Sequence, residues 1–404
     1  MTPDDPSESV VVTAERMVAG GEALARDDEG RIVFVRAAAP GDRLEVAITQ
    51  DRTSWRRGEI AHVVDAGAQR VRPPCEIRRR GCGGCDWQHL DEEAQLPAKR
   101  EVVVDALRRT ARLPDAVVTT GRSVPAAGYR TTLRVVGGPG GRASLRSERS
   151  HETVELTDCL VAHPVLRDVL PQLEIPDGVE VTIRVSAATG EITGYWDERR
   201  GHVGGWPVGA ATGGRAALTE HVAGHDLRVS AGSFFQSGPA AADLLVDAVA
   251  RAAPELADAS LVVDADAGVG LFAAVATPAS ASVITIESSR SAVDDSRVNL
   301  AGRDAVVHLG QVSGWRPDHR HAGRIDVVVA DPARSGLGRS ATAALVAAEP
   351  PVIVLVSCDP VAMARDSALL ARHGYRHAGT EVLDLFPHTH HVECVTRFER
   401  ALAD

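Results

Sequence analysis

The chain has 404 residues, of which 44% are hydrophobic and 25% charged, so it is long enough for two or three globular domains. No apolar run approaches the roughly 18 to 20 residues that a membrane span needs, and the polar start MTPDDPSES lacks the features of a signal peptide. We therefore exclude a membrane protein and expect a cytoplasmic one. The net charge of −11 argues against a nucleic-acid-binding protein, although binding depends on where charge lies as well as on its sum.

Basic residues gather between Arg52 and Arg134, where they outnumber acidic ones. They are almost all arginine, since Lys99 is the only lysine of the chain. The planar guanidinium group suits phosphate, so the stretch is a candidate contact for a polyanion. An arginine-rich composition with a solvated surface explains any single arginine as well, and the clustering, with a run of three at 78–80, favours the phosphate contact.

The first expected domain covers residues 1–72. Short alternating segments such as SVVVTAERM and DRLEVAITQ are separated by turns at Gly20-Gly21 and at residues 28–30. Several short strands with glycine turns are typical of a small β-barrel of the oligonucleotide-binding kind. Pro73-Pro74 marks the end of this domain.

A second expected domain, residues 73–236, is mixed α+β. It contains a predicted helix near 92–113, which could instead pack on the third domain, and alternating strands at 129–136 and 179–186. Four of the six cysteines lie here, and in a reducing compartment such a cluster favours metal or cofactor ligation over disulfides. The spacing suits an iron–sulfur cluster or a structural zinc without separating the two, and the cysteines are Cys75, Cys82, Cys85 and Cys159.

The third expected domain, residues 237–404, alternates strands with helices. The runs LVVDA, SVITIE, IDVVVA and PVIVLVS are apolar throughout, and helical segments such as PAAADLLVDAVARAA lie among them. Strands buried on both faces and separated by helices predict a doubly wound parallel sheet. Open sheets of this kind bind ligands at the carboxyl ends of their strands.

Polar residues follow these strands at that edge. The turn Asp264–Gly270 contains Asp266, Gly268 and Gly270, and its glycines let a ligand approach the backbone closely. Glu287 ends the next strand and could bind ribose hydroxyls. A tight turn closing a helix onto a strand is the alternative explanation, and the third glycine of a dinucleotide motif is missing.

Three further residues could carry chemistry. Asp331 opens the segment DPARSG, in which Arg334 occupies the position where amino-group methyltransferases carry an aromatic residue. Cys358 follows a buried strand and is exposed to the same edge, where a thiolate could attack an electron-poor carbon. Glu393 is an isolated acid in an apolar strand and is a candidate base. The nearby histidines at 388, 390 and 391 do not have the spacing of a helical zinc motif.

Taken together, these segments resemble the S-adenosylmethionine-dependent uracil-5 RNA methyltransferase family, which makes 5-methyluridine in tRNA and 23S rRNA. The resemblance covers nearly the whole chain, and SCDP followed by HVE is its most specific part. It implies an N-terminal TRAM barrel, a central domain with a [4Fe-4S] cluster on the four cysteines, and a Rossmann-like methyltransferase domain. The other segments that carry it are CEIRRRGCGGCDW, SFFQSG, DPARSGLG and FPHTHHVECV.

The resemblance also implies a role for each site residue. Cys358 would add to C6 of the uracil and Glu393 would remove the C5 proton. Asp331 would bind the uracil edge beside the cofactor, with Gln236 near both. The remaining expected contacts of S-adenosylmethionine are Asp264, Asp266, Gly268, Gly270 and Glu287. We expect a monomer that binds rRNA or tRNA and no membrane.

The chain departs from the family at three motifs. Asp266 and Ala267 stand where the family usually has an aromatic residue and a cysteine, Gly238 replaces an asparagine, and DPAR replaces DPPR. Two alternatives therefore stay open. A non-catalytic RNA-binding or chaperone protein on the same fold would need neither Cys358 nor Glu393, and a DNA cytosine methyltransferase would carry its nucleophile in a Pro-Cys pair.

Overall fold

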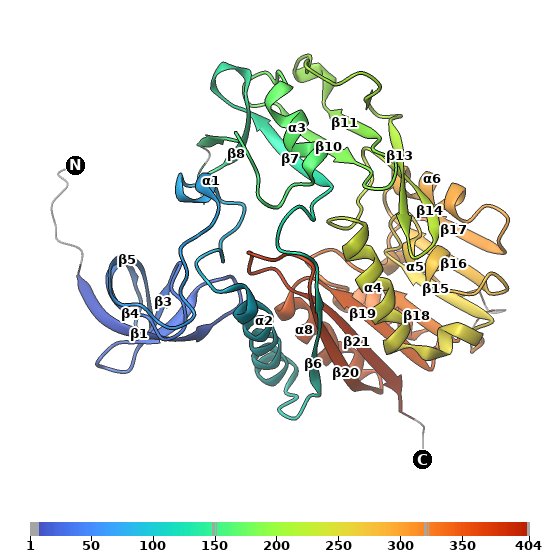
Figure 1. Cartoon of the computed structure of the whole chain (residues 1–404). Coiled ribbons are helices and arrows are strands. Elements are labelled where there is room, and N and C mark those ends of the chain that lie inside the picture. The colour runs from blue at the N-terminus through green and yellow to red at the C-terminus, as the bar shows by residue number, and fades with distance from the viewer. Residues whose placement is uncertain (1–7, 148–149, 151, 319–320, 322, 402–404) are drawn as a thin grey trace.

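The computed structural model describes residues 8–401 except 148–149, 151, 319–320 and 322. Residues 1–7, which make up most of the polar start used above to exclude a signal peptide, lie outside the described range. In the part of the chain that is described, no helix is both long and apolar enough to cross a membrane. Figure 1 shows a barrel, a central sheet and a larger α/β part following one another along the chain.

The N-terminal strands form a closed barrel in the order β1-β2-β3-β5-β4, as the sequence predicts. Alternate residues of β1 and β4, among them Val12, Ala14, Leu44 and Val46, are buried inside it. Closure leaves no free strand edge. The strands are β1 Ser9–Met17, β2 Ala23–Arg26, β3 Ile32–Val35, β4 Arg43–Asp51 and β5 Trp55–Asp65.

The central part is built on a six-stranded sheet in the order β12-β11-β10-β7-β8-β9. The cysteine-bearing segment and the short helix α1 (Glu76–Arg79) lie beside it, and a separate hairpin, β13 (Ala217–Val222) with β14 (His225–Ser230), follows it. The remaining elements are β7 Thr132–Gly137, β8 Ala143–Arg146, β9 Thr153–Glu155, α3 Pro164–Val169, β10 Glu180–Val185, β11 Ile192–Trp196 and β12 Ala211–Thr212.

The third part is an eight-stranded sheet in the order β17-β16-β15-β18-β19-β21-β20-β6. Its first five strands are parallel, as predicted, and all but the edge strand β17 are buried: β15 Leu261–Ala265, β16 Ser282–Glu287, β17 Ala305–Leu309, β18 Val327–Ala330 and β19 Val352–Ser357. The helices of this part are α4 Pro239–Ala252, α5 Leu271–Val275, α6 Arg290–Asn299, α7 Gly338–Val346 and α8 Pro360–Arg372.

Two features differ from the predicted parallel sheet and its boundaries. The strand β21 (Glu393–Arg400) inserts antiparallel between β19 and β20 (Tyr375–Asp384). The edge strand β6 (Val118–Ser123) comes from within the expected central domain and pairs in parallel with β20. The helix α2 (Glu92–Ala106) packs on β6, β20 and α8, so the segment 92–123 joins the third part, as the sequence allowed for the helix alone.

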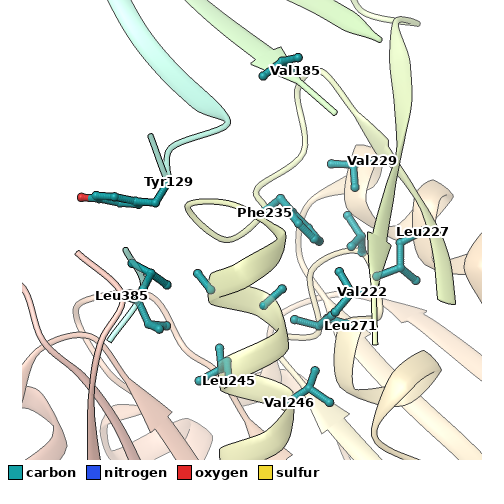
Figure 2. Close-up of a cluster of buried hydrophobic side chains, with 14 of the residues drawn as sticks. Tyr129, Val185, Val222, Leu227, Val229, Phe235, Leu245, Val246, Leu271 and Leu385 are labelled. Atoms are coloured by element: carbon teal, nitrogen blue, oxygen red, sulfur yellow. The ribbon is translucent and has the colours of Figure 1, made fainter. Parts of the chain in front are cut away.

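A continuous hydrophobic cluster joins the central part to the eight-stranded sheet. Around α4, Val222, Leu227 and Val229 of the hairpin lie on one side, and Tyr129 and Leu385 lie on the other (Figure 2). Each of these side chains is buried. This shared core fixes the residues before α4, including the SFFQSG segment, against the edge of the sheet where the strands end.

Candidate active site

The candidate nucleophile and base are brought together by strand register. Ser357, the last residue of β19, pairs with Cys394 of β21, so Cys358, directly after the strand, lies on the side of Glu393, the first residue of β21. The side chain of Cys394 points the other way, into the hydrophobic core, and is fully buried. Cys358 is only half-buried, so it is the accessible thiol of the two.

The motif SCDP ends β19 and starts α8. Asp359 is the N-cap of α8, and its carboxylate accepts hydrogen bonds from the amides of Val361 and Ala362. Pro360 occupies the first turn, where it costs no hydrogen bond. The Asp-Pro pair thus turns the chain sharply at Cys358, and the thiol lies at the positive end of a helix dipole.

Asp331, at the end of β18, is the third member of the group. Its carboxylate accepts a long hydrogen bond of 3.5 Å from the side-chain amide of Gln236. Burial raises the pKa of Asp331 to about 7, helped by the charge of Asp266. Burial also raises the pKa of Cys358 to about 12, with the charges of Glu393 and Asp331 acting in the same direction. Glu393 is buried, and its pKa is raised well above the usual range by burial and by Asp331.

The turn after β15 holds a second group of acids. Glu287 accepts hydrogen bonds from the amides of Gly268 and Ser289, at 2.9 and 2.6 Å. Asp264 is buried, with Oδ2 accepting from the amide of Ala273 while Oδ1 has no hydrogen-bond partner among the described residues. Burial raises the pKa of Asp264 and of Asp266, the latter to about 6, and neighbouring acids add to both shifts.

This turn is shaped for close approach by a ligand. Asp266 has a φ of 57°, a strained conformation for a residue with a side chain, and such strain often occurs at functional sites. A Cβ added at Gly268 would meet no atom within 4 Å, so the backbone there faces open space. The carboxyl groups of Asp264, Asp266 and Glu287 and the unpartnered Asp264 Oδ1 suit a cationic ligand, and S-adenosylmethionine carries a sulfonium and an ammonium group. The residues present therefore fit this cofactor.

A close backbone contact explains why position 238 is glycine in this chain, where the family usually has asparagine. A Cβ at this position would lie 2.3 Å from the carbonyl oxygen of Tyr129. The amide of Thr131 also bonds to the carbonyl oxygen of Ser237, so the two segments are in close backbone contact. The glycine permits this approach and leaves Gln236 at its place beside Asp331.

The histidines before β21 make contacts within the protein. His390 Nδ1 lies 2.6 Å from Asp86 Oδ2, and the carbonyl oxygen of His388 accepts from the amide of Trp87. The ring of His391 packs edge-on against Phe386, and its Nε2 lies 3.3 Å from the Arg334 guanidinium. Burial lowers the pKa of His391 to about 3, so this ring is neutral at physiological pH. Sequence reasoning missed Asp86 and Trp87, although both directly follow Cys85.

The four cysteines of the central part line one cavity of about 170 Å³. Arg78 and Arg130 line it as well. Burial raises the pKa of Cys82, Cys85 and Cys159, that of Cys85 to about 12. Across the described ranges, no three His, Cys, Asp or Glu side chains are grouped so that they could hold a single metal ion.

A cavity of about 420 Å³ lies where the barrel, the cysteine segment, the central sheet and the loop before β21 meet. Its lining includes Gly20 and Gly21 of the barrel, Asp86, and His390 and His391. It is also lined by Arg36, Arg134 and Arg146. We call this cavity the arginine groove. His391, whose Nε2 lies 3.3 Å from the Arg334 guanidinium, is part of this lining.

Comparison with known proteins finds relatives over most of the chain. The TRAM domain model matches residues 9–61, which is most of the barrel. An RNA methyltransferase from Streptomyces avermitilis is 35% identical over 95% of this chain and 96% of its own length. The 23S rRNA (uracil(1939)-C(5))-methyltransferase RlmD from Halomonas elongata is 32% identical over 94% of this chain and 87% of its own length. The chain belongs to the uracil-5 RNA methyltransferase family.

A solved structure supports the fold of this methyltransferase over its full length. The tRNA (uracil-54, C5)-methyltransferase from Pyrococcus abyssi, in complex with S-adenosyl-L-homocysteine, superposes with a TM-score of 0.70. The match covers 96% of this chain and 99% of the other at 23% identity. The order barrel, central part and methyltransferase part is therefore common to both chains. As an RNA methyltransferase, the chain takes its methyl group from S-adenosylmethionine.

Proposed function

We propose that this methyltransferase transfers a methyl group to C5 of a uridine in RNA through a covalent bond between Cys358 and C6 of the uracil. The observation that carries the proposal is the register of β19 and β21, in which Cys358 and Glu393 face each other at the strand ends with Asp331 nearby. A non-catalytic RNA-binding protein has no use for an accessible thiol opposite a buried acid.

The chemistry requires both groups because C5 of uracil is a poor nucleophile. The Cys358 thiolate adds to C6, and the electrons of the C5–C6 double bond move onto O4 as an enolate. S-adenosylmethionine supplies the electrophilic methyl group, which C5 takes. Glu393 then removes the proton on C5, the double bond reforms, and the bond between sulfur and C6 breaks. The uridine has to leave its base stack to reach this pocket.

Covalent trapping tests the proposal. Wild-type enzyme with 5-fluorouridine RNA should give a slowly migrating adduct on a denaturing gel, because fluorine cannot leave as a cation. Glu393→Gln should give the adduct with ordinary RNA, since the C5 proton stays. Cys358→Ala should give neither adduct nor methylated RNA. Methylation by Cys358→Ala would refute the nucleophile, and an adduct lost only in Cys394→Ala would assign it to the other cysteine.

For the substrate, the first RNA to test is 23S rRNA, because two of the relatives are named as 23S rRNA (uracil(1939)-C(5))-methyltransferases. Mapping of 5-methyluridine in total RNA with and without the gene distinguishes rRNA from tRNA. If 5-methyluridine stays unchanged in both rRNA and tRNA when the gene is absent, the proposed activity is wrong.

We further propose that Cys75, Cys82, Cys85 and Cys159 hold a [4Fe-4S] cluster. The support is the cavity that all four thiols line, together with a donor set of four cysteines. Protein purified without oxygen should be brown and contain about four iron and four sulfide per chain. Colourless protein with one zinc per chain would contradict this.

A further inference from the structure

The loop between β20 and β21, residues 385–392, is held by a buried charge. Lys99, on α2, has no exposed side-chain surface, and its Nζ lies 2.6 Å from Asp384 Oδ1. The same ammonium group donates to the carbonyl oxygen of Phe386 at 3.2 Å and lies 5.9 Å from the centre of the Trp87 ring. The only lysine of the chain is thus committed to the loop that leads into Glu393.

Asp384 connects this ion pair to the candidate base. It follows Leu383, which is the residue of β20 paired with Glu393 in β21. Its carboxylate also accepts from the amide of Phe386 at 3.0 Å, and its carbonyl oxygen accepts from the amide of Val124. The position of Asp384 therefore sets both the end of β20 and the start of the loop.

Gln95 holds the second half of the loop from one turn earlier on α2. Its Oε1 accepts from the amide of His388 at 2.6 Å, and its Nε2 donates to the carbonyl oxygen of Leu90 at 3.0 Å. His388 has a φ of 66°, a conformation that a residue with a side chain adopts only when its surroundings impose it. Gln95 and Lys99 lie on the same face of α2, four residues apart.

We propose that Lys99 and Gln95 are positioning residues that fix the loop so that Glu393 faces C5 of the target uracil. The inference rests on the proposed function. In the described part of the chain, the hydrogen bonds of Gln95 and Lys99 run to the loop and to Leu90, and none runs to Cys358 or its neighbours. Burial of the Lys99–Asp384 ion pair costs desolvation free energy that a pair of apolar residues would avoid. Loosening the loop should therefore slow proton removal and leave thiolate addition intact.

The test separates these two steps in single turnovers with labelled RNA and S-adenosylmethionine. Gln95→Leu and the double variant Lys99→Met with Asp384→Asn remove the contacts without leaving a buried unpaired charge. Both should form the adduct on 5-fluorouridine RNA as the wild type does. On ordinary RNA they should accumulate methylated adduct, with its release slowed between about ten-fold and a hundred-fold. Val103→Ala is the control, since Val103 lies one turn further along α2 with its side chain in the core beneath the sheet.

The outcomes distinguish this inference from the proposed function. Glu393→Gln is the reference, and if it accumulates no adduct on ordinary RNA, the proposed mechanism itself is wrong. If Glu393→Gln accumulates adduct while Gln95→Leu and the double variant do not, α2 does not position the base and the inference is overturned. Equal accumulation in Val103→Ala would show a general effect of destabilising α2 and would overturn it as well.

Discussion

At the scale of single residues, burial in the pocket disfavours the charged forms of Cys358 and Glu393. The pKa of Cys358 is raised to about 12 by burial and by the charges of Glu393 and Asp331, which outweigh the nearby Arg334. In the proposed mechanism the Cys358 thiolate attacks the uracil, so the raised pKa of Cys358 opposes the first step. S-adenosylmethionine bound by the acids around Asp266, as proposed, would bring positive charge near Cys358, and an added cation favours the ionised thiol.

Alkylation of Cys358 by iodoacetamide measures this balance. In wild-type protein without cofactor the rate should rise with pH up to a midpoint well above 8.5, the ordinary value for a cysteine. Asp331→Asn removes a negative charge, so the pKa of Cys358 falls and the midpoint should move to lower pH. Mass spectrometry separates Cys358 from Cys394, which is buried and should stay unlabelled. A wild-type midpoint at or below 8.5 would contradict the raised pKa.

At the scale of elements, a turn of the barrel touches the loop between β20 and β21. The indole nitrogen of Trp87 donates to the carbonyl oxygen of Gly21 at 3.0 Å. A Cβ added at Gly21 would lie 2.6 Å from Asp86 Oδ2 and 3.0 Å from the Cβ of His390. The barrel turn, the cysteine segment and the loop before Glu393 therefore meet at one point.

The two glycines of this turn provide a matched pair of variants. Both have positive φ, 92° at Gly20 and 88° at Gly21, so alanine strains the backbone at either by about 1 to 2 kcal/mol. A Cβ at Gly20 meets nothing within 4 Å. Gly21→Ala should therefore displace the loop and lower the methylation rate by about ten-fold to 10²-fold, the range that small misplacements of catalytic groups produce. Gly20→Ala should only lower the melting temperature. Equal activity at equal stability would show that this contact does not matter for catalysis.

The elements also show what the sequence could and could not predict. The barrel, the parallel strands from β15 to β19 and the helix α4 follow from hydrophobic period and turns, which are local signals. The edge strand β6 has one buried residue, Val118, among six and so lacks a strand pattern. Its partner β20 lies about 260 residues away in the chain, as do Lys99 and Asp384, which are 285 apart. Such pairings come from the packed fold and leave no local trace.

The candidate site likewise contains residues that the sequence could identify and contacts that it could not. Cys358 and Glu393 could be found because a thiol and an acid are unusual at the ends of apolar strands. The contacts of Asp86 with His390 and of Gln95 with His388 could not, because single polar residues on a helix or loop are ordinary at the surface. Two arginines of the stretch predicted to contact phosphate form ion pairs with acids of the barrel. Arg56 is buried among Glu8, Asp27 and Asp51 in the barrel, and Arg70 pairs with Asp42.

At the scale of the whole molecule, the net charge of −11 coexists with a local basic surface. The arginine groove takes Arg36 from the barrel and Arg134 and Arg146 from the central sheet, against the two acids Glu22 and Asp86 in the same lining. Of the arginines singled out by the sequence, Arg78 bonds the carbonyl oxygen of Cys82 and lines the cysteine cavity. Its removal would disturb that cavity, so it is a poor probe of RNA binding, and Arg134 and Arg146 are better ones.

Salt dependence of RNA binding tests this surface. Each phosphate neutralised by an arginine releases counterions, so the logarithm of the binding constant falls with the logarithm of salt concentration in proportion to the number of contacts. Arg134→Ala with Arg146→Ala should weaken binding to all RNA sequences alike and reduce this slope by about two, one for each contact. The pair of Arg146 with Glu180, 3.6 Å apart and exposed, is too weak for its loss to unfold the sheet.

The control is Arg199→Ala with Arg200→Ala, which removes the same charge from the short 3₁₀ turn Glu198–Arg200 after β11, outside the groove. It should lower affinity slightly through the net charge and leave the slope almost unchanged. If both double variants reduce the slope equally, the arginines act through total charge, and RNA does not follow the groove to the active site.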